Sequence, residues 1–139
     1  MTETTMKTIP SFGYEILRDG ILRSILGKHE ADVLYWSGKE IARKFPLFSL
    51  DEAPSFFLQA GWGHLAFEKE GKETYILLLT GDPDILKFDE RNFRLEAGFL
   101  AEQVQKLNGF LTECHEEVNV KKHFVTFTVK WDSKDPIEK

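Results

Sequence analysis

The sequence has a single cysteine and no long apolar run. Cys114 stands alone among 139 residues, which excludes an internal disulfide and zinc sites built from several cysteines, and a lone thiol is typical of a reducing compartment. The longest apolar run is Tyr75–Leu79, and no apolar segment follows the lysine near the start of the chain. We therefore expect a cytoplasmic protein with no signal peptide and no membrane span.

Positive charge is also in short supply. The chain has 18 Lys and Arg residues against 23 Asp and Glu residues, which gives a formal net charge of −5. A protein that binds nucleic acid usually clusters lysine and arginine against the phosphate backbone. The sequence therefore predicts no nucleic-acid partner.

The usual motifs for catalysis and for cofactor binding are missing as well. The sequence has no phosphate-binding loop, no serine elbow, no dinucleotide fingerprint and no calcium loop, and its four histidines are scattered. Cys114 and His115 are neighbours on a predicted strand, where successive side chains point to opposite faces of the sheet. We predict that the protein is not an enzyme, that it has no metal site and no cofactor, and that Cys114 is a buried structural residue.

The length of the chain is that of one domain. A chain of 139 residues buries roughly 70% of its unfolded surface, which suffices for one core without a disulfide or a metal ion. Both ends are polar and contain a proline, Pro10 and Pro136, so we predict flexible termini at residues 1–11 and 133–139. A single domain is expected over residues 12–132.

The N-terminal half of the sequence predicts three helices. Apolar residues recur every three or four positions from Gly13 to Leu26, which is typical of an amphipathic helix. A second helix is expected over about Glu30–Lys44, and a short third helix ends near Ala60. Gly20 and Gly38 interrupt the apolar stripes of the first two helices, and an interior glycine is usually tolerated where another backbone comes close.

The C-terminal half predicts two β-hairpins with a fourth helix between them. The hairpins are expected over residues 62–80 and 110–131, and the helix has its apolar stripe from Ala97 to Leu107. Because every residue from Tyr75 to Leu79 is apolar, we expect that strand to be central and covered on both faces. The predicted fold is α+β: three N-terminal helices, a β-hairpin, a helix and a second β-hairpin, giving an antiparallel four-stranded sheet packed on helices.

Four short stretches resemble a known family. They are Phe12–Leu17, Leu34–Ala42, Gly61–Gly63 and Gly98–Glu102. On these stretches the chain resembles the YslB-like proteins of Gram-positive bacteria, a family of unknown function. It is more distantly similar to the superfamily of 4-vinyl-reductase-type ligand-binding domains and TRAPP vesicle-trafficking subunits. The resemblance covers about residues 12–131 and implies a module that binds a small molecule or a protein and pairs through its helices.

The sequence departs from these relatives in its cysteines. The 4-vinyl-reductase-type domains commonly carry a cysteine cluster in the last hairpin, whereas the matching stretch Glu113–Phe127 holds Cys114 alone. The lipid-modified cysteine of one type of TRAPP subunit does not lie on the last hairpin, so the resemblance does not give that role to Cys114. A structural zinc site is therefore not expected, and acyl binding has no named anchor.

Aromatic residues are abundant, with 12 Phe and 3 Trp. A large aromatic core is the simplest interpretation, and the alternative is that some of these residues line an apolar pocket or a dimer face. As candidates for a dimer face on the first two helices we name Tyr14, Leu17, Ile21, Leu34, Gly38 and Ile41. As candidates for ligand binding we name Trp36, Trp62 and Cys114.

The sequence thus predicts a non-catalytic binding or scaffold module that forms a homodimer through its first two helices. Its expected partner is a second copy of itself, with an apolar small molecule or another protein as a further partner. The alternative is a sensor that binds a lipid-like or other apolar small molecule in a pocket between the helices and the sheet.

Overall fold

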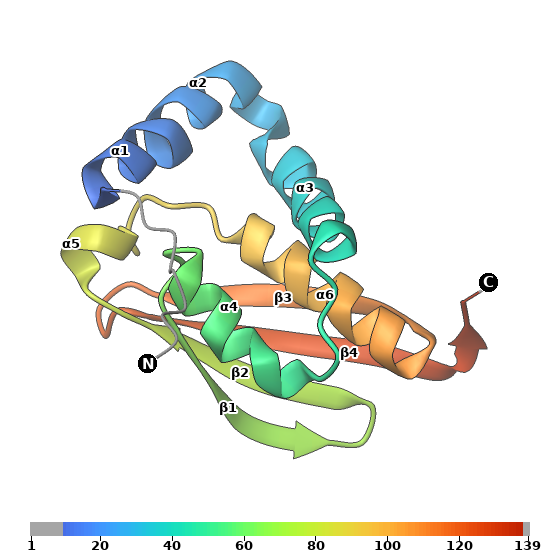
Figure 1. The fold of residues 1–139 in the computed structure, drawn as a ribbon. Helices are drawn as coiled ribbons and strands as arrows, with labels where there is room; N and C mark the ends of the chain where they lie inside the picture. The colour runs from blue at the N-terminus through green and yellow to red at the C-terminus, as the bar shows by residue number, and fades with distance from the viewer. Residues whose placement is uncertain (1–9, 138–139) are drawn as a thin grey trace, which may run out of the picture.

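The helices and strands follow one another in the order that the sequence predicts (Figure 1). The computed structural model describes residues 10–137. The first part of the chain holds α1 (Ser11–Glu15), a π-helical turn (Ile16–Ile21), α2 (Leu22–Leu26), a 3-10 turn (Gly27–His29), α3 (Glu30–Lys44), a second 3-10 turn (Leu50–Glu52) and α4 (Ala53–Gln59). The second part holds β1 (His64–Gly71), β2 (Thr74–Thr80), α5 (Pro83–Leu86), α6 (Arg94–Asn108), β3 (Phe110–Asn119) and β4 (Phe124–Pro136).

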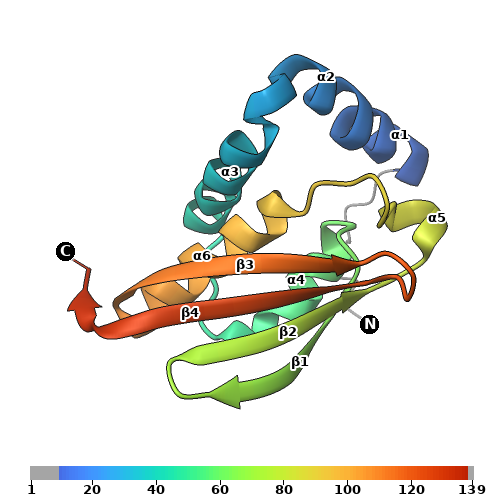
Figure 2. The ribbon, with the colours of Figure 1, turned by 180° about the vertical axis from the view of Figure 1, so that it is seen from behind.

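The four strands form one antiparallel sheet in the order β1-β2-β4-β3. In the central pair, Leu77 lies opposite Phe127 and Leu79 lies opposite Val125, and all four side chains are fully buried on the face that α4 and α6 cover. The view from behind shows no helix of residues 10–137 over the other face of the sheet (Figure 2). The predicted α+β fold with an antiparallel four-stranded sheet on helices is therefore confirmed.

Strand β2 is central, as predicted, but the expectation that it is covered on both faces is wrong for the described residues. Ile76 and Leu78 point to the uncovered face, where neighbouring strands leave them half-buried. Their cross-strand neighbours on β4, Thr128 and Thr126, are half-buried too. The continuous apolar run therefore indicates a central strand, but it does not indicate that a second layer covers the other face of the sheet.

Helices α3 and α6 cross with their backbones in contact. A Cβ atom built on Gly38 would lie 2.0 Å from the Leu95 carbonyl oxygen, and one built on Gly98 would lie 2.0 Å from the Tyr35 carbonyl oxygen. Only glycine fits at either position, because any larger side chain would push the two helices apart. The predicted close approach is thus found at Gly38, whereas Gly20 has open space around it and no helix crosses there.

Helix α6 is the centre of the molecule, because every residue from Leu95 to Val104 is buried. It lies between α3 and the sheet, so polar residues on it need partners inside the protein. Gln103 finds them on the chain that follows α3. Its Oε1 atom accepts a hydrogen bond from the Leu47 amide at 3.1 Å, and its Nε2 atom donates to the Phe45 carbonyl oxygen at 2.9 Å.

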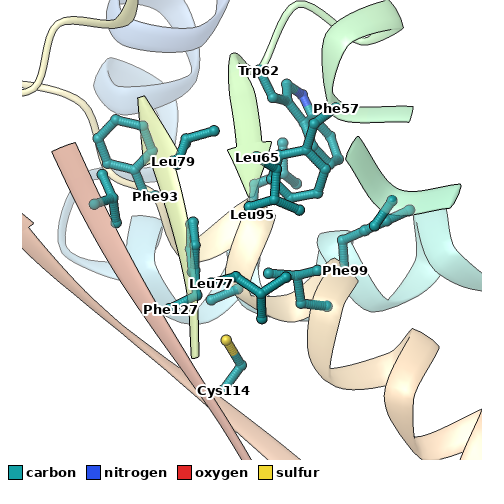
Figure 3. Close-up of a cluster of buried hydrophobic side chains, with 14 of the residues drawn as sticks. Phe57, Trp62, Leu65, Leu77, Leu79, Phe93, Leu95, Phe99, Cys114 and Phe127 are labelled. Carbon is teal, nitrogen blue, oxygen red and sulfur yellow. The ribbon is translucent and has the colours of Figure 1, made fainter. Parts of the chain in front are cut away.

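Aromatic rings fill the space between the helices and the sheet (Figure 3). Phe57 meets Trp62 edge-on with ring centroids 5.0 Å apart, and Phe99 lies 5.3 Å from Trp62 and 5.9 Å from Phe57. Phe127 of the sheet closes the cluster at 6.5 Å from Phe57. The aromatic core that the composition suggested is present, although Phe45 and Phe48 remain outside it and are exposed.

The C-terminal strand is longer than the sequence predicts. Strand β4 continues past Trp131 to Pro136, which pairs with Phe110, so the strand extends into the segment 133–139 for which the sequence predicts flexibility. The Ile137 amide donates a further hydrogen bond to the Gly109 carbonyl oxygen at 3.0 Å. The other segment that the sequence predicts to be flexible is residues 1–11. Of these, residues 1–9 lie outside the described residues.

The glycine crossing leads to a stability prediction. Replacing Gly98 by alanine places a methyl group against the backbone of α3, and we expect the free energy of unfolding to fall by about 3 kcal/mol. Urea unfolding followed by circular dichroism measures this loss. Gly20→Ala is the matched control, since its methyl group has open space and gains up to about 1 kcal/mol of helix propensity. Similar effects of the two substitutions would contradict the close crossing.

Candidate functional site

The N-terminal helix, residues 11–26, turns an apolar face to the solvent. Its large apolar side chains have exposed fractions between 37% and 73%, and they are Phe12, Ile16, Leu17, Ile21, Leu22 and Ile25. A contiguous apolar patch of this kind usually marks contact with another molecule. We call these six residues the outward face and treat it as the candidate functional site.

The opposite side of this helix is polar and lies against the protein. Arg18 is its only fully buried residue. The Nη2 atom of Arg18 lies 2.6 Å from the Glu96 carboxylate on α6, and neither side chain has more than 2% of its surface exposed. The same nitrogen donates to the Asn92 carbonyl oxygen at 2.9 Å. A buried ion pair therefore fixes the middle of the helix to the centre of the molecule.

A second ion pair lies beside the first. Arg91, which is 5% exposed, donates from Nε and Nη2 to the two carboxylate oxygens of Asp19 at 3.0 and 2.9 Å. This two-pronged geometry holds the direction of the helix as well as its position. Towards the ends of the helix, Arg23 donates to the Glu90 carbonyl oxygen and Glu15 lies 3.6 Å from Lys87.

Tyr14 connects the ion pair to the aromatic core. Its hydroxyl oxygen accepts hydrogen bonds from Arg18 at 2.7 Å and from the indole nitrogen of Trp62 at 3.0 Å. Burial alone would lower the pKa of Arg18, but the charge of Glu96 and the hydroxyl of Tyr14 outweigh it and raise that pKa above its ordinary value. The partners of Arg18 therefore favour its charged form.

The π-helical turn explains why the apolar residues share one face. In a π turn the backbone hydrogen bonds join residues five apart, so Ile16 and Ile21 lie above one another on the solvent side. Tyr14 and Arg18, four residues apart, share the side that faces the protein. The outward face therefore runs along the whole helix while the charged side stays against the core.

The structure changes the predicted dimer face. Leu17 and Ile21 are exposed, as a contact between two copies requires. Tyr14, in contrast, faces the core. Leu34 and Gly38 are buried against other parts of the same chain, so they are not open to a second copy. Ile41 is half-buried and packs against the core.

The three predicted ligand-binding residues do not come together. Trp36 is 60% exposed on α3, whereas Trp62 is buried in the aromatic core and bound to Tyr14. Cys114 is buried beneath the helices, and its backbone amide donates to the Tyr35 hydroxyl at 3.2 Å. Burial and the nearby charge of Glu116 raise the pKa of the Cys114 thiol well above its ordinary value, against the opposite effect of Arg94.

The described part of the chain contains neither a cluster of metal-ligating side chains nor a membrane-spanning helix. Over residues 10–137, no three His, Cys, Asp or Glu side chains converge in a way that could hold a metal ion. Within the same range, no helix has the length and hydrophobicity needed to cross a lipid bilayer.

Sequence reasoning missed the residues that orient the N-terminal helix. The apolar repeat predicts an amphipathic helix with Tyr14, Leu17 and Ile21 as candidates for a dimer face, but it does not identify Arg18 or Asp19. One signal was present, because two charged residues of opposite sign interrupt an otherwise apolar segment between Leu17 and Ile21. Their partners Arg91 and Glu96 lie far along the sequence and carry no motif that would identify them.

Comparison with known sequences confirms the resemblance found from the sequence. A family described as "Protein of unknown function (DUF2507)" matches residues 11–130. Uncharacterized protein YslB of Bacillus subtilis is 42% identical over 130 residues, which cover 91% of this chain and 88% of that protein.

Comparison with solved structures confirms the distant similarity in fold. A vinyl-4-reductase family protein from Methanocaldococcus jannaschii matches with a TM-score of 0.66 and 20% identity, over 91% of this chain and 84% of that one. A trafficking protein particle complex subunit 3 from Naegleria fowleri, covalently bound to palmitic acid, matches with a TM-score of 0.59 and 12% identity, over 92% and 95% of the two chains. At these identities the similarity concerns the fold.

The buried ion pair leads to a second prediction. Replacing either Arg18 or Glu96 by methionine leaves the other charge buried without a partner, so we expect each change to lower the free energy of unfolding by about 3–5 kcal/mol. The double variant R18M/E96M leaves no such charge, and its loss should be well below the sum of the two single losses. Urea unfolding of the four proteins gives this coupling energy.

The matched control for this cycle is the exposed pair of Arg43 and Glu40, whose side chains are 49% and 36% exposed. Glu40→Gln should change the unfolding free energy by less than about 1 kcal/mol, because water screens an exposed pair. Single losses at Arg18 and Glu96 that simply add would mean that the two charges do not depend on each other.

The burial of Cys114 gives a third prediction. Because its raised pKa and its lack of exposed surface keep the thiolate scarce and shielded, iodoacetamide at pH 8 should leave the folded protein unmodified. The same reagent should add one label to the unfolded chain in urea. Mass spectrometry counts the labels, and rapid labelling of the folded protein would show that the thiol is accessible.

Proposed function

We propose that this chain, which belongs to the DUF2507 family of proteins of unknown function, is a non-catalytic binding or scaffold module that forms a homodimer through the outward face. The observation that carries this proposal is the orientation of the N-terminal helix, whose charged side lies against its own domain while its apolar side is open. Exposed apolar surface is unfavourable in water, and a partner that covers it gains the hydrophobic free energy.

A second copy of the chain fits the outward face. In a two-fold antiparallel pairing of two such helices, Phe12 of each copy meets Ile25 of the other, and Ile16 and Ile21 meet near the axis. Arg18 and Asp19 point into their own domain, so they bring no like charges together across this pairing. Apolar residues at both ends of the helix make the face complementary to itself.

The expected strength of this dimer follows from the size of the side chains. Full burial of a large apolar side chain contributes about 1.5–3 kcal/mol, so a side chain that is half exposed contributes roughly 1 kcal/mol when covered. The outward faces of two copies together give a gain on the order of 10 kcal/mol. This is comparable to the cost of association, about 4–15 kcal/mol, so the dimer population should depend on concentration.

The polar groups of the site support a non-catalytic role. Glu96 has no exposed surface and is bound to Arg18, so its carboxylate has no route for exchanging protons with a substrate. The buried thiol of Cys114 lacks the exposure that a nucleophile needs. A lone thiol also fits a reducing compartment, and we place the protein in the cytoplasm as part of this proposal.

The alternative function, an apolar small molecule held between the helices and the sheet, has less support. The side chains of Phe57, Phe99 and Phe127 occupy that space and are fully buried. A ligand there would have to displace packed rings, which costs more than filling an empty cavity. The palmitic acid of the Naegleria fowleri subunit is the observation in favour of this alternative, and it rests on similarity in fold.

Analytical ultracentrifugation tests the dimer and gives a fourth prediction. The unaltered protein should shift from monomer to dimer as its concentration rises. The double variant I16E/I21E, which places a charge in the middle of the outward face of each copy, should stay monomeric and keep its fold.

Leu111→Glu is the matched control for this experiment. Leu111 is 50% exposed on β3, outside the outward face, so its substitution should leave the dimer unchanged. A protein that is monomeric at every concentration, or an equal loss of dimer in the control, would exclude association through the outward face.

A further inference from the structure

A second surface lies at the opposite end of α6. An open groove has a volume of about 670 Å³. It lies between residues 48–51, which precede α4, the hairpin end of β1 and β2, and the last turns of α6. Its apolar walls are formed by Phe48, Phe67, Tyr75, Val104 and Leu107, and we call it the end groove. The volume falls within the range of about 300–1,000 Å³ that is usual for ligand-binding pockets.

The wall that carries Phe48 is held in place although its side chain is 94% exposed. The Phe48 amide donates to the Glu52 carboxylate at 3.1 Å, and Ser49 caps the following turn by accepting from the Asp51 amide at 3.2 Å. Just before it, Gln103 binds the backbone of Phe45 and Leu47 from both sides. The exposed ring is thus presented by an ordered backbone, which reduces the entropy lost on binding.

The floor of the end groove is a part of the sheet that the helices leave open. Phe67 lies opposite Leu77, so it points to the face that α4 and α6 cover elsewhere, yet it is 43% exposed. A β-bulge between Phe67 and Lys69 then shifts the alternation of β1, and Glu70 lies opposite Tyr75. The bulge therefore turns a carboxylate towards the groove.

The charge around the end groove is negative. Asp51, Glu68 and Glu70 line it together with a single amine, Lys69. Among residues 10–137, no arginine, lysine or histidine forms an ion pair with any of these three carboxylates. An apolar groove with an acidic rim attracts a cationic ligand and disfavours one that ends in a carboxylate or a phosphate.

We propose that the end groove binds a short segment of another protein that carries both apolar and basic side chains. The apolar walls take its aliphatic or aromatic residues, and the three carboxylates take its lysine or arginine residues. The groove is open to the solvent, so an extended segment can lie in it. Strand β1, whose residues 67–70 line the groove, is an edge strand, so among the described residues no strand pairs with its outer side. This site is separate from the outward face and does not depend on the dimer.

Fluorescence polarisation tests the charge preference and gives a fifth prediction. The probe is a fluorescein-labelled octapeptide of alternating leucine and lysine, and the comparison peptide alternates leucine and glutamate. The lysine peptide should bind the full chain and weaken as salt is added, whereas the glutamate peptide should not bind. Equal binding of both peptides, or binding of neither, would overturn the proposal.

Charge reversal locates the binding. The variant E68K/E70K should bind the lysine peptide at least tenfold more weakly, because the attraction becomes a repulsion. The matched control is E113K/E117K, which makes the same change in charge at two exposed positions of β3 on the uncovered face of the sheet. Equal weakening in both variants would show non-specific attraction to an acidic protein and would exclude the end groove.

The apolar part of the proposal has its own test. Phe48→Ser removes an exposed ring from the wall, so it should weaken the peptide without changing the unfolding free energy, while Leu111→Ser on β3 should have no effect. A fluorescent fatty acid is the final comparison. If it binds, is lost in Phe48→Ser, and the lysine peptide does not bind, the occupant is an acyl chain and the proposal is wrong.

Discussion

The backbone contact between α3 and α6 determines where every other part of the molecule lies. Gly38 and Gly98 allow the two helices to approach until the carbonyl oxygens of one touch the α-carbons of the other. At that separation α6 is enclosed by α3 on one side and the sheet on the other, and its polar residues must find partners within the protein. Towards the start of α6, Glu96 binds Arg18 of the N-terminal helix. Towards its end, Gln103 binds the backbone of the chain that follows α3. Both candidate surfaces are therefore positioned by one helix crossing.

The orientation of the N-terminal helix is a choice between two faces. If the apolar face were turned inwards, the hydrophobic gain would be about 1 kcal/mol or more for each side chain, and Arg18 and Asp19 would reach the solvent. The protein instead buries Arg18 against Glu96, an arrangement whose desolvation cost offsets much of the attraction. Such a pair adds little stability but defines one geometry strictly, because each charge is costly without its partner. A helix that buries its charged side and exposes its apolar side is expected where the apolar side binds another molecule.

The fold was predictable from the sequence because its signals are local. The glycine at 109 in a left-handed conformation, the alternation along β4 and the 3.6-residue repeat of α6 each depend on a few neighbouring residues. Which face of a helix meets the core cannot be predicted from local sequence, since the repeat from Tyr14 to Ile25 is the same whichever face is buried. The same applies to Gly20 and Gly38, which look alike in sequence although only Gly38 has a helix against it. The buried ion pair joins residues 78 positions apart, and no spacing rule reports it.

The elements that carry the two candidate surfaces, the N-terminal helix and the hairpin end of β1 and β2, lie towards opposite ends of α6 (Figure 1). Glu96, which holds the N-terminal helix, and Leu107, which lines the end groove, are separated by about 16 Å along the helix axis, given a rise of about 1.5 Å per residue. At this distance the free-energy effect of a substitution at one surface should simply add to the effect of a substitution at the other. A domain with two candidate contact surfaces, both held in place by one rigid helix, suits the proposed module that joins partners. For such a module the rigidity of α6 matters more than any reactive side chain, because a fixed angle between two partners requires α6 to stay packed on all sides.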